Sequence, residues 1–284
     1  MPVLPMQRIL KDAFQRRYGV GAFNIFNELT MRAVLAAAVI TRSPVIVQVS
    51  VKTVKRMGTR LIQVMFGELA GSLPIPATLH LDHCPDRALI QECIDAGWNS
   101  VLFDASQLDY ESNLAQTSQV VAQAHHRGVA VEGELESVKG VEDGCGAEAE
   151  TQVVPLSQAV AFMRATGIDS FAPAIGTAHG LYQCQPKINF ARVSEIVETE
   201  PLPLVVHGAT GLSGETLREL IRRGAVKINL STQMKMTFTE SLRAGLNAHP
   251  GGVEPLALLG NVESAVASMS ADFMRVIGSA GKAA

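Results

Sequence analysis

The sequence predicts a (β/α)8 barrel, or TIM barrel, with a short N-terminal capping helix and a C-terminal helical extension. Three observations lead to this fold class. Short apolar segments typical of buried parallel strands alternate eight times with longer segments of helical spacing. The 284 residues are near the usual length of such a barrel plus a tail. Polar residues collect where the apolar segments end, which is where barrel enzymes keep their sites. We therefore expect one barrel domain over residues 1–284, in which 250–284 form a helical tail.

The elements can be followed in order along the chain. The segment 3–16 is amphipathic and forms the predicted capping helix. Gly97, Gly128 and Gly224 follow three of the later helices, as C-terminal caps do. The predicted strands are the apolar runs 19–25, 44–50, 75–83, 100–104, 129–135, 169–175, 202–206 and 225–230. The predicted helices are 28–40, 60–70, 86–96, 109–126, 157–166, 189–198, 214–223, a segment capped by Ser231 or Thr232 that runs to about Asn247, and the tail 254–284.

One connection is long and irregular. Residues 136–154 are rich in Gly and in acidic side chains, and a loop of this length in a compact pattern is typical of a lid. A doubly wound open sheet is the alternative fold. It is less favoured because no Gly-rich nucleotide fingerprint follows the first strand.

Composition excludes several classes of function. The formal net charge is −3 and the Lys and Arg residues are scattered, so we expect no nucleic-acid or membrane-surface binding. The four cysteines show no paired spacing, which indicates reduced thiols. Neither a leader pattern nor an apolar run long enough to span a bilayer is found, and we expect a soluble cytoplasmic protein.

Three histidines stand at the ends of predicted strands. His83 follows Asp82 at the end of one strand, His179 lies in a Gly-flanked loop after another, and His207 ends a third. Residues so far apart in sequence can converge only if their strands are parallel neighbours. Three neutral imidazoles with an open coordination position are what catalytic zinc requires. Cys84 beside His83 could also ligate a metal, but we favour its interpretation as a small buried hydrophobic residue.

Further carboxylates lie at neighbouring strand ends. Asp82 would stay ionised beside a divalent cation and could exchange a proton with a substrate. Asp104 and Glu134 could hold a second cation, or they could be charged rim residues bonded to backbone; the pattern favours neither. The last two strands are followed by Gly208-Ala209-Thr210 and Asn229-Leu230-Ser231-Thr232, and loops at these positions commonly bind phosphate in such barrels.

Six motifs in this order resemble the class II, metal-dependent ketose-bisphosphate aldolases of the fructose- and tagatose-bisphosphate type. The resemblance covers nearly the whole chain. The motifs are His80-Leu81-Asp82-His83, Phe103-Asp104-Ala105-Ser106, Val131-Glu132-Gly133-Glu134-Leu135, Gly176-Thr177-Ala178-His179-Gly180, His207-Gly208-Ala209-Thr210-Gly211 and Lys227-Ile228-Asn229.

The resemblance implies zinc ligands at His83, His179 and His207. It also implies that Asp82 handles the proton of the hydroxyl at C4, and that Glu142, on the mobile loop, exchanges the proton at the carbon of dihydroxyacetone phosphate. Asp104 and Glu134 match second-metal positions, and a monovalent cation is often found nearby in the family. Members are homodimers or homotetramers. The substrate-binding set that we predict comprises Asn24, Gln48, Ser50, Gly180, Gly208, Ala209, Thr210, Asn229, Ser231 and Thr232.

Departures from the family pattern concern the lid and the distal end of the substrate. Glu136 and Lys139 stand where the lid normally has glycines, which predicts less hinge freedom. The segment 254–259 lacks the arginines that are common near the C-terminus of the family, and these would suit a second phosphate. Lys52 or Lys55 could compensate.

We therefore expect a zinc-dependent lyase. It would reversibly cleave a ketose (bis)phosphate to dihydroxyacetone phosphate and an aldehyde, such as glyceraldehyde 3-phosphate, through a metal-bound enediolate. Two alternatives are a metal-dependent barrel hydrolase, which would not need the phosphate loops, and a non-catalytic sugar-phosphate-binding protein, which would not need Asp82 or Glu142.

Overall fold

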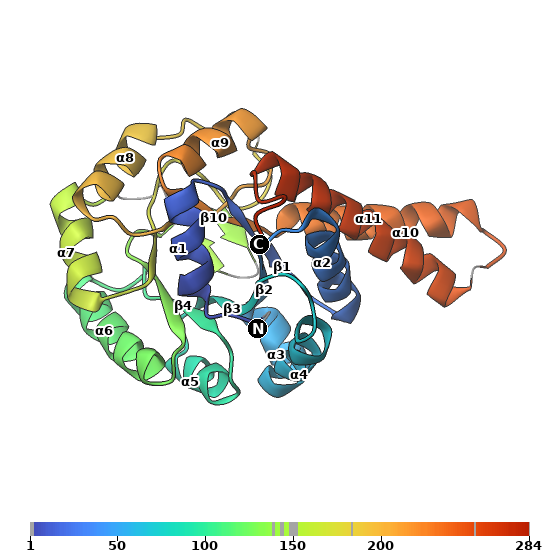
Figure 1. The fold of residues 1–284 in the computed structure, drawn as a ribbon, viewed down its shortest axis with the longest axis horizontal. Helices are drawn as coiled ribbons and strands as arrows, with labels where there is room; N and C mark the ends of the chain where they lie inside the picture. The colour runs from blue at the N-terminus through green and yellow to red at the C-terminus, as the bar shows by residue number, and fades with distance from the viewer. Residues whose placement is uncertain are drawn as a thin grey trace.

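The computed structural model describes residues 3–137, 140–142, 145–147, 153–182, 184–252 and 254–283; for Val141, Glu142 and Cys145–Ala147 it describes the backbone alone. Eight parallel strands close into a barrel in which β1 pairs with both β2 and β10 (Figure 1). The barrel strands are β1 (Val20–Asn24), β2 (Val45–Ser50), β3 (Ala77–Cys84), β4 (Ser100–Asp104), β5 (Ala130–Glu134), β8 (Ser170–Ala172), β9 (Leu204–Val206) and β10 (Ala225–Leu230).

Helices surround the barrel as the alternation predicts (Figure 1). The predicted TIM barrel, its N-terminal helix and its C-terminal helical extension are confirmed. The helices are α1 (Met6–Arg16), α2 (Glu28–Thr41), α3 (Val51–Met57), α4 (Thr59–Ala70), α5 (Arg87–Asp95), α6 (Tyr110–His126), α7 (Leu156–Thr166), α8 (Phe190–Thr199), α9 (Gly214–Arg222), α10 (Thr232–Ala248) and α11 (Pro255–Val276).

The sequence missed two features. The helix α3 begins directly after β2, because Ser50 is both the last strand residue and the N-cap. No turn residue separates the two elements in the sequence, so the start of α3 has no local signal. The connection 136–154 contains a short antiparallel hairpin, β6 (Gly140–Glu142) and β7 (Cys145–Ala147), instead of being irregular throughout.

The N-terminal helix α1 closes the end of the barrel where the strands begin. Val3 bridges Ala77, the first residue of β3, and the amide of Leu4 donates to the carbonyl of Ala77 at 3.0 Å. Met6 and Leu10 are fully buried on the same helix. This end is therefore covered, and the carboxyl ends of the strands are left as the open rim.

The last two helices form an arm that projects beyond the barrel (Figure 1). At its base, α11 packs against α2 and α10, and Phe273 makes an edge-to-face contact with Phe23 of β1, with ring centroids 5.9 Å apart. The side chain of Glu254 caps α11 by accepting from the amide of Ala257 at 2.7 Å. Within the parts of the chain that are described, none of the helices has both the length and the apolar character needed to cross a membrane.

Glu136 anchors the base of the long connection. Its carboxylate is buried, accepts from the amides of Val154 and Ala174 at 2.7 Å each, and pairs with the guanidinium of Arg192 on α8. Burial raises the pKa of this carboxyl, although the two backbone amides and Arg192 oppose that rise. The residue that replaces a lid glycine therefore fixes both ends of the connection to the barrel. Lys139, the other replacement, lies outside the described residues.

This anchor yields a stability prediction. Replacing Arg192 with Leu leaves a buried carboxylate without its cation, so Arg192→Leu should lower the free energy of unfolding by about 3–5 kcal/mol. Arg164→Leu is the matched control, because Arg164 pairs with Glu200 at the surface, and exposed pairs contribute at most about 1 kcal/mol. Urea unfolding measures both, and equal losses in the two variants would contradict the anchor.

Candidate active site

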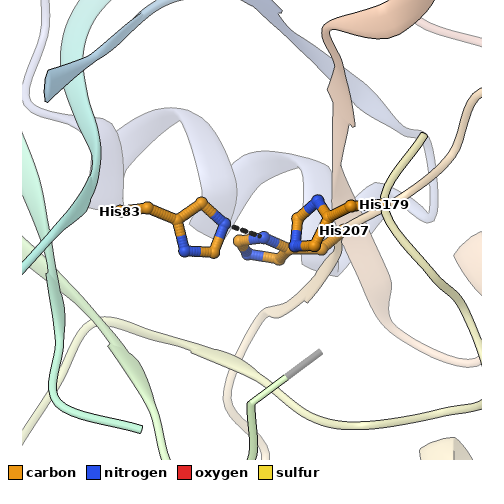
Figure 2. Close-up of side chains that lie close together, drawn as sticks. All are labelled: His83, His179 and His207. Atoms are coloured by element: carbon orange, nitrogen blue, oxygen red, sulfur yellow. Dashed lines mark hydrogen bonds between the residues drawn. The ribbon is translucent and has the colours of Figure 1, made fainter. Parts of the chain in front are cut away.

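His83, His179 and His207 converge at the rim of the barrel (Figure 2). His83 comes from β3, His207 directly follows β9, and His179 lies in the loop after β8. Nε2 of His83 is 2.7 Å from Nδ1 of His207, and one nitrogen from each of the three rings lies within 4.8 Å of the others. The predicted convergence of these three strand ends is therefore present in the structure.

A bulge at the end of β3 directs two successive side chains into the site. Leu81 pairs with Val101 of β4 and Cys84 pairs with Phe103, so Asp82 and His83 together face a single residue of β4. His83 has a positive φ of 40°, a conformation that few non-glycine residues adopt. Adjacent strand residues normally point to opposite faces, and bulges beside active sites re-aim side chains in this way. The bulge explains how a carboxylate and its sequence neighbour both reach the three-histidine cluster.

Carboxylates fix the orientation of two of the rings. Nδ1 of His83 lies 2.8 Å from Oδ2 of Asp104, and Nε2 of His207 lies 3.0 Å from Oε1 of Glu132. Since an ionised carboxylate only accepts, each of these ring nitrogens donates. The opposite nitrogen of each ring faces the cluster. Carboxylate partners of this kind set the tautomer and the basicity of metal-ligating histidines.

The electrostatics of the two rings differ. Burial, reinforced by His83 and Lys227, holds the pKa of His207 well below its ordinary value. Burial acts the same way on His83, but Asp82 and the hydrogen bond to Asp104 outweigh it and raise the pKa of His83 well above its ordinary value. The same bond to His83 outweighs burial at Asp104 and lowers the pKa of that carboxyl. Metal binding at the cluster would therefore release a proton from His83.

Asp82 presents one oxygen to the site. Its Oδ2 accepts from Nδ2 of Asn24 at 2.7 Å. Its Oδ1 is buried, has no hydrogen-bond partner among the described residues, and lies 4.0 Å from Nε2 of His83. A buried acceptor left without a donor costs stability, and here it lies beside three imidazoles, which favours a cation or a substrate hydroxyl at this position.

The two loops that carry His179 and His207 are held together. Gly208 has a φ of 68°, and a Cβ at this position would lie 2.2 Å from the carbonyl oxygen of Ala178. The hydroxyl of Tyr182 donates to the carbonyl of Gly208 at 2.7 Å and accepts from the amide of Ala178 at 3.0 Å. Sequence reasoning missed Tyr182; the only signal was its position three residues after His179.

The predicted phosphate loops meet at the start of α10. The amide of Gln233 in the first turn of α10 lies 3.4 Å from Oγ1 of Thr210, which joins the loop after β9 to the loop after β10. Ser231 is the N-cap residue, one of the two predicted, but its side chain makes no capping hydrogen bond. Its buried Oγ has no hydrogen-bond partner within the described residues. A helix N-terminus with an unused hydroxyl is a suitable environment for a phosphate.

The remaining predicted residues differ in their placement. Asp104 and Glu134 lie beside His83, and these three residues form a second group that could hold a metal ion. Gln48 is fully buried, and the two polar atoms of its amide contact Asn24 and Lys227. Ser50 lies at the end of β2 beside Asp82. The backbone of Glu142 lies in β6, but its side chain is outside the described residues.

The donor set fits a divalent cation with a preference for nitrogen ligands. Three imidazoles present one nitrogen each, two of them with carboxylate partners on the opposite nitrogen, and the buried Oδ1 of Asp82 lies close by. This is the ligand composition of a three-histidine zinc site with an open position. Cys84 is buried, and its thiol donates to the carbonyl of Asp86 at 3.3 Å.

Comparisons with known proteins agree with this geometry. The chain is 37% identical to the fructose-bisphosphate aldolase of Geobacillus stearothermophilus, over all of both chains. It is 36% identical to the 6-phospho-5-dehydro-2-deoxy-D-gluconate aldolase of Bacillus licheniformis, with 100% of this chain and 97% of the relative covered. It is 32% identical to the sulfofructosephosphate aldolase of Alkalicoccus urumqiensis, with 100% of this chain and 99% of the relative covered. The crystal structure of the YdjI aldolase from Escherichia coli K12 superposes with a TM-score of 0.87 at 28% identity, with 99% of this chain and 100% of that chain covered.

The protein-family model described as fructose-bisphosphate aldolase class-II matches residues 4–282 of this chain. Because the match spans nearly the whole chain and the relatives are named as aldolases, the predicted lyase class is confirmed. The chain belongs to the class II fructose-bisphosphate aldolase family.

Proposed function

We propose that this protein is a zinc-dependent aldolase that reversibly cleaves a ketose phosphate to dihydroxyacetone phosphate and an aldehyde. The observation that carries the proposal is the convergence of His83, His179 and His207 beside Oδ1 of Asp82, which has no hydrogen-bond partner in the described part of the chain. The neighbouring phosphate loops favour an aldolase over a hydrolase, because a hydrolase would not need them. The predicted cytoplasmic location and the predicted homodimer or homotetramer stay predictions.

The three histidines would hold the zinc ion, and Asp104 and Glu132 would orient His83 and His207. When bound, the metal supplies a Lewis acid that polarises the substrate carbonyl and stabilises negative charge next to it. Asp104 and Glu134 could alternatively hold a second divalent cation. The carboxylate of Asp104 already accepts from the ring of His83 at 2.8 Å, which supports the orienting role.

Asp82 would move the proton of the C4 hydroxyl. In the direction of cleavage, its Oδ1 would accept that proton as the bond between C3 and C4 breaks and the aldehyde forms. Asn24 holds Oδ2 by a hydrogen bond of 2.7 Å and so directs Oδ1 toward the site. Glu142 would deliver a proton to the carbon of dihydroxyacetone phosphate that was C3 of the ketose.

The phosphate of dihydroxyacetone phosphate would bind between the loops after β8, β9 and β10. It would accept hydrogen bonds from backbone amides near Gly180 and Gly208, from the hydroxyls of Thr210 and Ser231, and from the amides in the first turn of α10. The buried Oγ of Ser231, without a hydrogen-bond partner among the described residues, supports this placement. Ala209, Asn229 and Thr232 complete the proposed phosphate-binding set.

The other end of the substrate would carry a second anionic group. A cavity of about 390 Å³ adjoins Asn24 and is lined by three cationic side chains, those of Lys52, Arg56 and Lys235. Lys55, the other lysine considered from the sequence, does not line it. The names of the three relatives each contain a phosphate together with a second acidic group: a second phosphate, a sulfo group or a gluconate. The cationic cavity supports the same pattern in this protein.

The first test combines metal removal with product identification. Chelation should abolish activity, and zinc or cobalt should restore it, because the metal supplies the electrophile. Across a panel of ketose phosphates, the restored enzyme should release dihydroxyacetone phosphate, measured by a coupled dehydrogenase assay. Full turnover by the metal-free protein would contradict the mechanism, and release of inorganic phosphate without a triose product would indicate a hydrolase.

A second test separates the two proton transfers. Asp82→Asn should retain the metal and lower the cleavage rate by on the order of 10²–10⁴. Glu142→Ala should bind dihydroxyacetone phosphate with little loss, but exchange of the carbon-bound hydrogen with deuterated water should nearly stop. Mass spectrometry of the recovered triose measures this exchange. Unchanged exchange in Glu142→Ala would show that Glu142 has no such role.

A third test addresses the distal group. Arg56→Gln should lower kcat/KM about tenfold for ketoses with a second anionic group, since a hydrogen bond to a charged group contributes about 1.5–3 kcal/mol. Ketose monophosphates without that group should be unaffected. Lys55→Gln is the control, because Lys55 is exposed on the same helix but does not line the cavity. An equal effect of Arg56→Gln on both substrate classes would contradict the assignment.

A further inference from the structure

The interior of the barrel contains a fully buried cation, Lys227 of β10. Its Nζ lies 2.7 Å from Oε1 of Gln48, 2.8 Å from Oδ1 of Asn229 and 2.9 Å from Oε2 of Glu132. An ammonium has three N–H donors and no acceptor. The ammonium donates hydrogen bonds to Gln48 and Asn229, and it forms an ion pair with the carboxylate of Glu132.

One connection leads from Lys227 to Asp82. Because Lys227 can only donate, the carbonyl oxygen of Gln48 must face it, and the amide nitrogen of Gln48 then faces Oδ1 of Asn24 at 2.7 Å. That contact turns the nitrogen of Asn24 toward Oδ2 of Asp82, also at 2.7 Å. An amide side chain can otherwise adopt two orientations with oxygen and nitrogen exchanged. A reversed Asn24 would place an oxygen against the carboxylate.

A second connection leads from Lys227 to the three-histidine cluster. Glu132 is fully buried, contacts Lys227 through Oε2 and accepts from Nε2 of His207 through Oε1 at 3.0 Å. A buried carboxylate without a cation is costly, so Lys227 stabilises the ionised Glu132 that fixes the ring of His207. Nδ1 of that ring is then the nitrogen that faces His83.

The third contact orients Asn229. Its Oδ1 accepts from Lys227, which leaves its nitrogen as the group available to donate to a substrate oxygen. Interiors of such barrels are usually filled by layers of branched apolar side chains. The polar interior here departs from that pattern, and its contacts connect Lys227 to Asp82 and His207 at the rim.

We propose that Lys227 is a positioning residue that sets the direction of the hydrogen bonds in both halves of the catalytic site. Through Gln48 and Asn24 it holds Asp82 with Oδ1 toward the substrate, and through Glu132 it holds His207 with Nδ1 toward the metal. The catalytic role of Asp82 rests on the proposed aldolase function. The connection to His207 can be tested by metal binding alone.

Two variants each interrupt one connection. Gln48→Met keeps the length of the side chain but removes the amide, so it should lower kcat at saturating metal by about 10- to 100-fold, the scale expected for a misplaced catalytic group. KM and the dissociation constant of the metal should stay close to those of the parent. Glu132→Gln should instead weaken metal binding by roughly 10- to 100-fold, and most of kcat should return at saturating metal.

Lys227→Met interrupts both connections and should show both losses. If Lys227 acts on Asp82 through Gln48, the double variant Gln48→Met/Lys227→Met should have a kcat no lower than that of Lys227→Met. Thr78→Val is the control. It removes a fully buried hydroxyl of β3 that has no hydrogen-bond partner within the described residues, and it should change neither kcat nor metal affinity.

Cobalt titration of the metal-free proteins measures metal affinity, and thermal unfolding confirms that each variant is folded. A parental kcat in Gln48→Met, a parental metal affinity in Glu132→Gln, or an additive loss in the double variant would overturn the proposal. If Lys227→Met does not fold, the two single-connection variants decide the question. If the parent cleaves no ketose phosphate, the proposed function fails, and the metal affinity of Glu132→Gln still tests the connection to His207.

Discussion

Closure of the parallel sheet between β1 and β10 is the constraint on which the site depends. The pairing of β1 with β10 places Val20 opposite Lys227 and Ala22 opposite Asn229. Closure places the last strand next to β1 and one strand away from β2, so that Lys227 contacts Gln48 from 179 residues away. It also gathers the carboxyl ends of all eight strands at one rim, since α1 covers the other end. An open sheet would leave β1 and β10 at separate edges and would separate Asp82 from the polar interior.

The polar interior has an energetic consequence. Removing Lys227 and Glu132 from water carries a penalty that their attraction only partly offsets, so such a pair is weak evidence for stability. What the arrangement provides is a fixed orientation of the hydrogen-bonding side chains. The ammonium donates to Gln48 and Asn229 and pairs with the carboxylate of Glu132, and each amide beyond it has a single favourable orientation. The same burial lowers the pKa of His80 and of His207, which favours neutral rings inside the barrel.

Much of the fold and part of the site could be predicted from the sequence. The alternation of apolar and helical segments indicated the barrel, and the positions of His83, His179 and His207 at strand ends indicated their convergence, because strand ends of a parallel sheet meet at one edge. These predictions depend on local patterns that the chain shows directly.

Other features depend on tertiary contacts that no local pattern encodes. The bulge at Asp82 and His83 follows from pairing with β4, and nothing in the sequence distinguishes it from a regular strand end. Gln48 was placed in the substrate-binding set from the family resemblance, whereas its full burial and its contacts with Asn24 and Lys227 arise only in the folded barrel. Glu136 was interpreted as a loss of hinge freedom, whereas its partners Val154, Ala174 and Arg192 become neighbours only in the folded barrel.

The central claim is that three imidazoles form a metal site beside Asp82, and X-ray absorption of the zinc-loaded protein tests it most directly. The account predicts one zinc per chain with nitrogen and oxygen ligands at about 2.0–2.1 Å and no sulfur ligand. Cys84 lies next to His83 in sequence, so a thiolate is the nearest competing ligand. A zinc–sulfur distance of about 2.3 Å, or a coordination shell unchanged when His179 and His207 are both replaced by Ala, would contradict the account.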